Sequence, residues 1–350
     1  MGRFLSEKYK GLEPYIPGEQ PKVGEFIKLN TNENPYPPSA DALEEASRAA
    51  GNLNLYNDPD CNILRDELAK LYGVDRDEIV FGNGSDEILS YAFMAFCDKE
   101  HPIAFPDISY GFYPILAGSI GCPYTEIPVE EDLSICTDDY LQLNCNIVFA
   151  NPNAPSGLAL QTSDIERICR SNPNNVVIVD EAYVDFGWES CVPLIHSLDN
   201  LLVVQTFSKS RSLAGGRLGF AVGCKELIAD INAIRNATNP YNINSVAQAM
   251  GAAIFRDDAY TKKTCSRIIK TRDTFAEGLR ELGFYVTDSH TNFVFAKHPA
   301  INGEELYKKL KERGVLVRHF KKEKICEYIR ISIGTDQQME TVLRIIGELI

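Results

Sequence analysis

The 350-residue chain lacks the features that would point to nucleic acid or to a membrane. Basic residues are outnumbered, with 35 Lys and Arg against 49 Asp and Glu and a net charge of −14. Binding to a phosphate backbone needs clustered Lys and Arg, and Glu323 interrupts the densest basic run, residues 321–324, which is typical of a solvated loop. No uncharged apolar run approaches the roughly 20 residues that span a bilayer. We therefore expect neither a nucleic-acid nor a membrane partner.

Paired cysteine motifs are missing as well. The chain has 10 cysteines, but no two of them have C-x-x-C spacing, and the closest pair is Cys136 and Cys145. Free thiols in a reducing compartment fit this pattern better than disulfides or zinc ligands, so we expect no metal. The N-terminal residues lack the apolar stretch of a signal peptide. These absences predict a cytoplasmic protein.

Short apolar runs alternate with helix-like stretches through the middle of the chain. The predicted strands are residues 79–81, 103–105, 124–127, 147–150, 176–180, 201–206 and 220–223. The helices predicted among them are residues 85–96, 110–119 and 162–171. Apolar strands without strict alternation, joined by helices, indicate an α/β fold with a mostly parallel sheet covered on both faces.

The character of the chain changes after residue 225. Helices are predicted at 225–235 and 243–255, followed by a long amphipathic stretch at 258–282 and a smaller α+β region. That region has predicted strands at 284–286, 293–296, 315–317 and 328–331 and predicted helices at 303–313 and 337–349. We predict an N-terminal arm (1–40) that packs on the small domain or a partner, a large domain (41–265) and a small domain (266–350).

Two chemically suggestive side chains end predicted strands. Lys209 follows the run 201–206, and Asp180 ends the run 176–180. Ligands of such sheets bind beyond the carboxyl ends of the strands. Pyridoxal 5′-phosphate needs a lysine that holds it as a Schiff base, a carboxylate that keeps its ring nitrogen protonated, and a donor to its ring oxygen. Asp180 alone would be read as a capping residue, but together with Lys209 and Tyr183 it predicts the catalytic set of a pyridoxal phosphate site.

A phosphate cradle is predicted where a strand, a Gly-x-Gly turn and a helix start follow one another at residues 79–86, because the N–H groups of a helix N-terminus bind anions. The predicted cofactor-binding residues in this stretch or near Lys209 are Gly84, Ser85, Asp86, Thr206, Ser208 and Arg217, and Ser208 and Arg217 would add a hydroxyl and a guanidinium to the phosphate. Ser85 and Asp86 would equally serve as ordinary N-cap residues. Tyr110, at another strand end, would either stack on the cofactor ring or pack as an ordinary aromatic.

Three motifs together resemble those of fold-type I aminotransferases over almost the whole chain: Asn151–Gly157, Asp180–Tyr183, and Ser208-Lys209 with Arg217. Four further stretches resemble the histidinol-phosphate aminotransferase family: Gly11–Gly18, Leu29–Pro35, Gly82–Glu87 and Tyr328–Thr335. The resemblance implies a large domain with a seven-stranded sheet, a smaller α+β domain and pyridoxal phosphate bound to Lys209. It further implies a homodimer with a shared active site and transfer of an amino group from L-histidinol phosphate to 2-oxoglutarate in histidine biosynthesis, giving imidazole acetol phosphate and L-glutamate.

The resemblance also assigns roles to single residues. Tyr56 would reach the partner's cofactor phosphate, and Arg330, helped by Arg318, would bind the anionic end of the substrate. Tyr15 and Asn32 would line the substrate side. Without the resemblance, Arg330 would be read as a surface arginine on an edge strand.

One position departs from the family pattern. The family usually has Asn directly before Pro-Thr/Ser-Gly, where it donates to the ring oxygen of the cofactor, but here the residue is Ala154. We expect Tyr183 to make this contact with help from Asn153, so that the substitution tunes the cofactor and leaves activity intact.

Alternative functions stay open at this point. A decarboxylase of a phosphorylated amino acid such as threonine phosphate would share every cofactor residue, and an aromatic amino acid aminotransferase would differ only in its substrate. A pyridoxal-binding regulator without catalysis is disfavoured by the acidic charge, and a nucleotide-binding module is disfavoured because no Gly-Lys-Ser/Thr motif follows the Gly-x-Gly turn.

Overall fold

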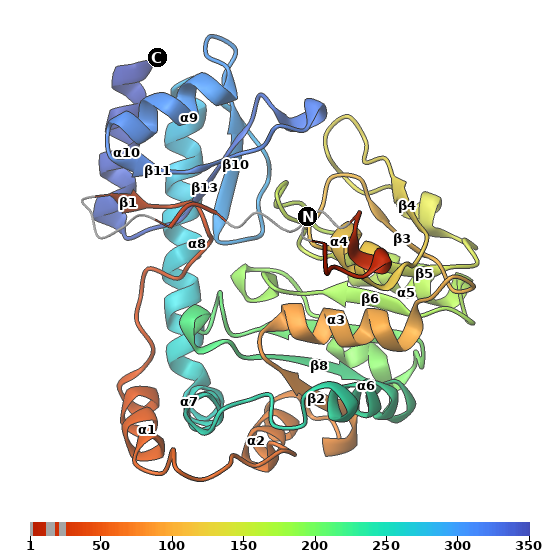
Figure 1. Cartoon of the computed structure of the whole chain (residues 1–350). Helices are drawn as coiled ribbons and strands as arrows, with labels where there is room; N and C mark the ends of the chain where they lie inside the picture. Colours follow the sequence, from red (N-terminus) through yellow and green to blue (C-terminus); the bar gives the residue numbers. More distant parts are fainter. Residues whose placement is uncertain (1–2, 12–17, 21–25) are drawn as a thin grey trace.

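The computed structural model describes residues 3–11, 18–20 and 26–350. Its larger part is built on a seven-stranded sheet of order β2-β8-β7-β6-β5-β3-β4 (Figure 1). The strands are β2 (Ile79–Gly82), β3 (Ile103–Pro106), β4 (Tyr124–Ile127), β5 (Asn146–Ala150), β6 (Val177–Asp180), β7 (Leu201–Thr206) and β8 (Gly219–Gly223). All seven lie where the apolar runs predict them.

The sheet is mixed, although most of its pairs are parallel. The pairs β3–β4, β3–β5, β5–β6 and β6–β7 are parallel, whereas β8 runs antiparallel to both β7 and β2. The β7–β8 connection, residues 207–218, holds only a short 3₁₀ turn and no crossover helix, so the chain returns antiparallel. The carboxyl ends of β5, β6 and β7 therefore meet at one edge of the sheet.

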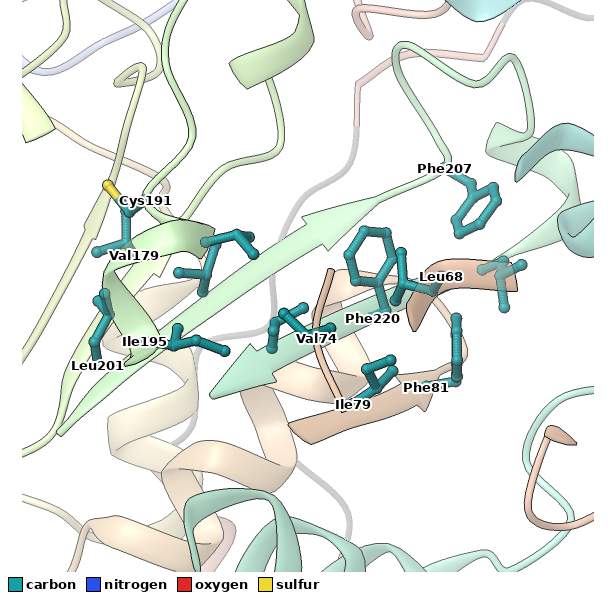
Figure 2. Close-up of a cluster of buried hydrophobic side chains, with 14 of the residues drawn as sticks. Leu68, Val74, Ile79, Phe81, Val179, Cys191, Ile195, Leu201, Phe207 and Phe220 are labelled. Carbon is teal, nitrogen blue, oxygen red and sulfur yellow. The ribbon is translucent and has the colours of Figure 1, made fainter. Parts of the chain in front are cut away.

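Both faces of this sheet are buried, which explains the unbroken apolar strands. Val177 and Val179 point into a core formed with helices α2, α5 and α7, while Ile178 points into the core under α3, α4 and α6. Figure 2 shows part of the first core, where Phe81, Phe207 and Phe220 cluster. The covering helices are α2 (Asn62–Tyr72), α3 (Ser85–Phe96), α4 (Tyr113–Ile120), α5 (Thr162–Ser171), α6 (Lys225–Thr238) and α7 (Ser245–Arg256).

The smaller part is an α+β unit at the other end of the molecule. Its four-stranded antiparallel sheet has the order β12-β13-β10-β9, and β1 pairs in parallel with β11 beside it. The strands are β1 (Ile27–Lys28), β9 (Tyr285–Val286), β10 (Phe293–Lys297), β11 (Val315–Leu316), β12 (Arg318–His319) and β13 (Ile329–Ser332), and the helices are α9 (Gly303–Glu312) and α10 (Asp336–Leu349). The early residues 27–28 thus belong to a sheet built mainly from the end of the chain.

One long helix, α8 (Asp258–Glu281), spans both parts and runs most of the height of the molecule (Figure 1). It packs against α7 at one end and against α10 and β9 at the other. The predicted domain boundary at 265/266 falls inside this helix, and the domain limits stay a prediction. The described residues contain no helix with the length and apolarity that a bilayer crossing requires.

The fold differs from the sequence expectation near the N-terminus. Helix α1 (Ala40–Ala50) and helix α2 were not predicted; α1 lies within the first 55 residues, where Pro, Asn and Tyr are frequent. Helix α1 is capped by the Ser39 hydroxyl, which accepts from Ala42 N, and a Ser or Thr before a helix is the usual start signal. Short 3₁₀ turns complete the description: η1 (Glu7–Tyr9), η2 (Arg76–Glu78), η3 (Thr137–Tyr140), η4 (Val184–Phe186), η5 (Val192–His196), η6 (Ala214–Gly216) and η7 (Glu323–Ile325).

Candidate active site

A cavity of about 720 Å³ lies between the carboxyl ends of the central strands and the small sheet. It brings together most of the residues predicted from the sequence. Twelve of them line it: Asn32, Ser85, Asp86, Tyr110, Asp180, Tyr183, Thr206, Ser208, Lys209, Arg217, Arg318 and Arg330. Ala154, at the position that departs from the family pattern, lines it too.

Lys209 extends from the loop after β7 toward the N-terminal segment. Its Nζ donates to Thr31 O over 3.0 Å and lies 5.9 Å from the centre of the Tyr183 ring. Burial lowers the pKa of Lys209 to about 8, and the nearby Arg330 guanidinium lowers it too, while Asp86 and Glu33 oppose the shift. A substantial fraction of this amine is therefore neutral near physiological pH, as a nucleophile or a base requires.

Asp180 ends β6 on the same side of the sheet, and only 4% of its surface is exposed. Tyr113 Oη donates to its Oδ2 over 3.1 Å, and Ala182 N donates to its Oδ1 over 3.2 Å. Burial nevertheless raises the pKa of Asp180 to about 6. Within the part of the chain that the structure describes, Asp180 forms no ion pair, and the cation that acts to lower its pKa is the more distant Lys209 amine.

Tyr183 follows Asp180 by three residues and is 8% exposed. Its Oη accepts a hydrogen bond from Asn32 Nδ2 over 2.8 Å, and its ring meets Phe293 edge-on. Burial raises the pKa of Tyr183, so the phenol keeps its proton at neutral pH.

The turn before α3 has the form of an anion cradle. Gly84 has φ of +82°, which favours glycine, and the first N–H groups of α3 have no partner within the helix. Gly219 lies against this turn so closely that a Cβ there would come within 2.5 Å of Ser85 N. Arg217 Nη2 reaches Asp86 Oδ2 at 3.0 Å, which places a guanidinium at the mouth of the turn.

Two arginines of the small sheet also line the cavity. Arg318 on β12 is the register partner of Arg330 on β13. Arg330 Nη2 donates to Asn30 O over 3.2 Å, and its guanidinium lies 5.2 Å from the centre of the Phe293 ring. Paired guanidiniums suit a phosphate or a carboxylate.

Four predicted residues are not among those that line the cavity. Gly84 contributes the backbone turn directly before Ser85. The Asn153 amide is held in its own loop, donating to Ile108 O over 2.9 Å and accepting from Ser109 Oγ over 2.8 Å. Tyr56 is 86% exposed, and its ring centre lies 4.8 Å from that of Tyr241 with the two rings tilted by 33°. Tyr15 lies outside the described residues. The assigned roles of these residues stay predictions.

The structure adds residues that the sequence reasoning missed. Glu33 lines the cavity, and Asn34 Nδ2 donates to Lys209 O and Ser210 O, each over 3.1 Å. Lys321 and Lys322 lie in an exposed loop, as predicted, but they also line the cavity, and Lys322 Nζ donates to Asp107 O over 2.6 Å. Glu33 and Asn34 could have been suspected from the high content of Asn, Thr and Glu in residues 30–34.

Comparison with known proteins agrees with this geometry. Residues 24–346 match the model of the family described as aminotransferase class I and II. The chain belongs to this family. The aminotransferase is 47% identical over 340 residues to the histidinol-phosphate aminotransferase of Lactococcus lactis subsp. cremoris strain MG1363, covering 97% of this chain and 96% of the relative. It is 45% identical over 350 residues to histidinol-phosphate aminotransferase 1 of Pseudomonas fluorescens strain Pf0-1, covering 100% of both.

A solved structure shows the same fold. The histidinol-phosphate aminotransferase of Sinorhizobium meliloti in complex with pyridoxal 5′-phosphate has a TM-score of 0.88 and 21% identity, covering 100% of this chain and 99% of that one. The predicted α/β fold and the resemblance to aminotransferases are confirmed.

The cofactor of this aminotransferase is pyridoxal 5′-phosphate, as in its family, and the residues present fit it. Among the described residues the buried Asp180 has no ion-pair partner, which a protonated ring nitrogen would supply. The turn at Gly84 offers backbone donors to a phosphate, and the amine of Lys209 lies in the same cavity.

Proposed function

We propose that the protein is a histidinol-phosphate aminotransferase of histidine biosynthesis, which interconverts L-histidinol phosphate and 2-oxoglutarate with imidazole acetol phosphate and L-glutamate. The observation that carries the proposal is the cavity that Lys209 and Asp180 share with Arg330 and Arg318. The relatives of 45–47% identity that bear this name support the choice of amino donor.

The residues divide the work by position. Ser85, Asp86, Thr206, Ser208 and Arg217 would hold the cofactor phosphate, and Asp180 would hold the ring nitrogen protonated. When bound, pyridoxal phosphate supplies an electron sink for the charge that develops at the substrate Cα. Lys209 would hold the cofactor covalently in the resting enzyme, and its Nζ, once free, would take the proton from Cα and deliver it to C4′.

Substrate recognition would rest on local charge. The chain has a net charge of −14, which repels an anionic substrate at long range. Arg330 and Arg318 would overcome this repulsion inside the cavity, where screening by salt is weaker. Asn32 and Tyr15 would line the substrate side.

The working unit would be a cytoplasmic homodimer. Tyr56 is exposed beside Leu53 and Leu55, which are 58% and 65% exposed, so an apolar patch surrounds it. A second copy would cover this patch and receive Tyr56 at its cofactor phosphate.

A direct assay tests the amino donor. The purified protein is given histidinol phosphate, phenylalanine or threonine phosphate, each with 2-oxoglutarate, and formation of glutamate and release of carbon dioxide are followed. Glutamate formation that is fastest with histidinol phosphate is expected, and the Lys209→Ala variant should lose at least about 10²-fold in turnover. Activity confined to phenylalanine would move the assignment to an aromatic aminotransferase, and carbon dioxide release from threonine phosphate would move it to a decarboxylase.

A further inference from the structure

Asn32 joins the two parts of the molecule through its backbone. It has φ of +57°, a region that Asn tolerates better than most residues. Its N–H donates to Ser332 Oγ over 2.9 Å, and its carbonyl accepts from Asn292 Nδ2 over 2.9 Å. Asn32 is 1% exposed and Ser332 is 2% exposed, so these contacts are shielded from water. The small sheet therefore fixes the position of Asn32.

The same contacts fix the direction of its side-chain amide. Ser332 Oγ already accepts from Asn32 N, so the Ser332 hydroxyl proton is free to donate. Ser332 Oγ lies 2.9 Å from Asn32 Oδ1, which accepts this proton. Turning the amide over would leave this buried hydroxyl proton without any other acceptor in the described part of the chain, which is costly. Oδ1 therefore faces Ser332, and Nδ2 faces Tyr183 Oη at 2.8 Å.

This arrangement decides what the Tyr183 hydroxyl does. Its oxygen accepts from Asn32, so its proton is available for another partner. Among residues 3–11, 18–20 and 26–350, no group accepts a hydrogen bond from Tyr183 Oη, and Tyr183 lines the cavity. The phenol is thus arranged to donate to a ligand.

We propose that Asn32 is a positioning residue: the relay Ser332–Asn32–Tyr183 aims the Tyr183 proton at the ring oxygen of the cofactor. The inference rests on the proposed placement of pyridoxal phosphate between Lys209 and Asp180. It assigns Asn32 a role different from contact with the substrate. It also gives a physical reason why Ala154 is tolerated, because Tyr183, oriented by Asn32, supplies the donor to the ring oxygen.

The test reads the bound cofactor itself, in the absence of substrate. A donor to the ring oxygen favours its deprotonated form, so the pH midpoint of the absorbance change of the bound cofactor reports the hydrogen bond. Asn32→Gly suits the positive φ and removes the amide, while Ser332→Ala removes only the hydroxyl that orients it. Both variants should raise the midpoint by about half to one pH unit, as expected for one lost hydrogen bond.

Two controls separate aiming from general support. Ser332→Thr keeps the hydroxyl and should restore the wild-type midpoint. In a Tyr183→Phe background, Asn32→Gly should give no further shift, because coupled residues are not additive. A midpoint unchanged in Ser332→Ala would overturn the inference, and so would an equal shift from Asn32→Gly in the wild-type and Tyr183→Phe backgrounds. The comparison of Ser332→Ala with Ser332→Thr tests the inference even where Asn32→Gly fails to fold. A wild-type protein that binds no pyridoxal phosphate would instead overturn the proposed function.

Discussion

Tyr113 Oη donates to Asp180 Oδ2, and this bond holds the carboxylate at the end of β6 facing the cavity. Tyr113 is fully buried at the start of α4, so the support comes from a packed aromatic and not from a mobile side chain. The hydrogen bond offsets only part of the cost of burial, since the pKa of Asp180 remains raised to about 6. The cofactor-free protein therefore keeps a destabilising acid in place for its ligand.

The first prediction concerns stability without cofactor. The pKa of Asp180 is raised from its ordinary value of 3.8 to about 6 in the folded protein. Between these values the folded state binds more protons than the unfolded chain, so stability falls as pH rises, and the loss is complete above about pH 6. Asp180→Asn should add about 1–3 kcal/mol to the free energy of unfolding at pH 8 and much less at pH 4. Urea denaturation of the cofactor-free proteins at both pH values measures this, and an equal gain at both would contradict it.

The second prediction concerns the amine of Lys209. Since burial lowers its pKa to about 8, the rate at which the cofactor-free protein attaches pyridoxal phosphate should rise with pH through a midpoint near 8. An ordinary exposed lysine would give a midpoint above about 10. Stopped-flow absorbance measures the rate, and the Lys209→Ala variant supplies the background. A midpoint near that of exposed lysines would show that the cavity does not tune this amine.

The third prediction concerns the anionic end of the substrate. Arg330→Gln should lower kcat/KM for histidinol phosphate by about 10- to 150-fold, the range expected for a charge-assisted hydrogen bond. Arg318→Gln is the matched control, because Arg318 is its register partner on the neighbouring strand, and it should cost less. Steady-state kinetics with both variants measure the two effects. A larger loss of kcat/KM in Arg318→Gln than in Arg330→Gln would show that Arg318, and not Arg330, is the main contact for the anionic end of the substrate.

The fourth prediction concerns the departure from the family pattern. Ala154→Asn places a second donor on the cavity wall, where Ala154 is 7% exposed. The pH midpoint of the bound cofactor should fall by up to about one pH unit, with turnover altered far less. Spectrophotometric titration of the two proteins checks this, and an unchanged midpoint would mean that position 154 does not reach the ring oxygen.

Much of the fold could be predicted because the sheet is buried on both faces. Strands such as Val177–Asp180 and Leu201–Thr206 begin with at least three apolar residues, and Asp180 ends the first strand while Lys209 follows the second at the same edge of the sheet. The antiparallel direction of β8 could not be read from its composition, since it depends on the short connection before it. The two-residue strands β1 and β12 were missed, whereas the equally short β9 and β11 lie within predicted apolar runs.

The candidate site divides in the same way. Lys209, Asp180 and Tyr183 follow strong strand signals, so their shared cavity could be anticipated. The contacts of Asn32 and Asn34 could not, because they join residues far apart in the sequence through single hydrogen bonds. No local pattern encodes such partners. Asn153 belongs to a recognisable motif, but its side-chain amide donates to Ile108 O, and Asn153 is not among the residues that line the cavity.

The bond between Asn32 and Ser332 links residues 300 positions apart. During synthesis on the ribosome, Asp180 and Lys209 emerge long before β13 does. The tyrosine beside them can receive its oriented partner only after almost the whole polypeptide has been made. A nascent or prematurely terminated chain would thus expose the reactive amine without the group that aims the neighbouring phenol, and competence for chemistry would arise only near the end of translation.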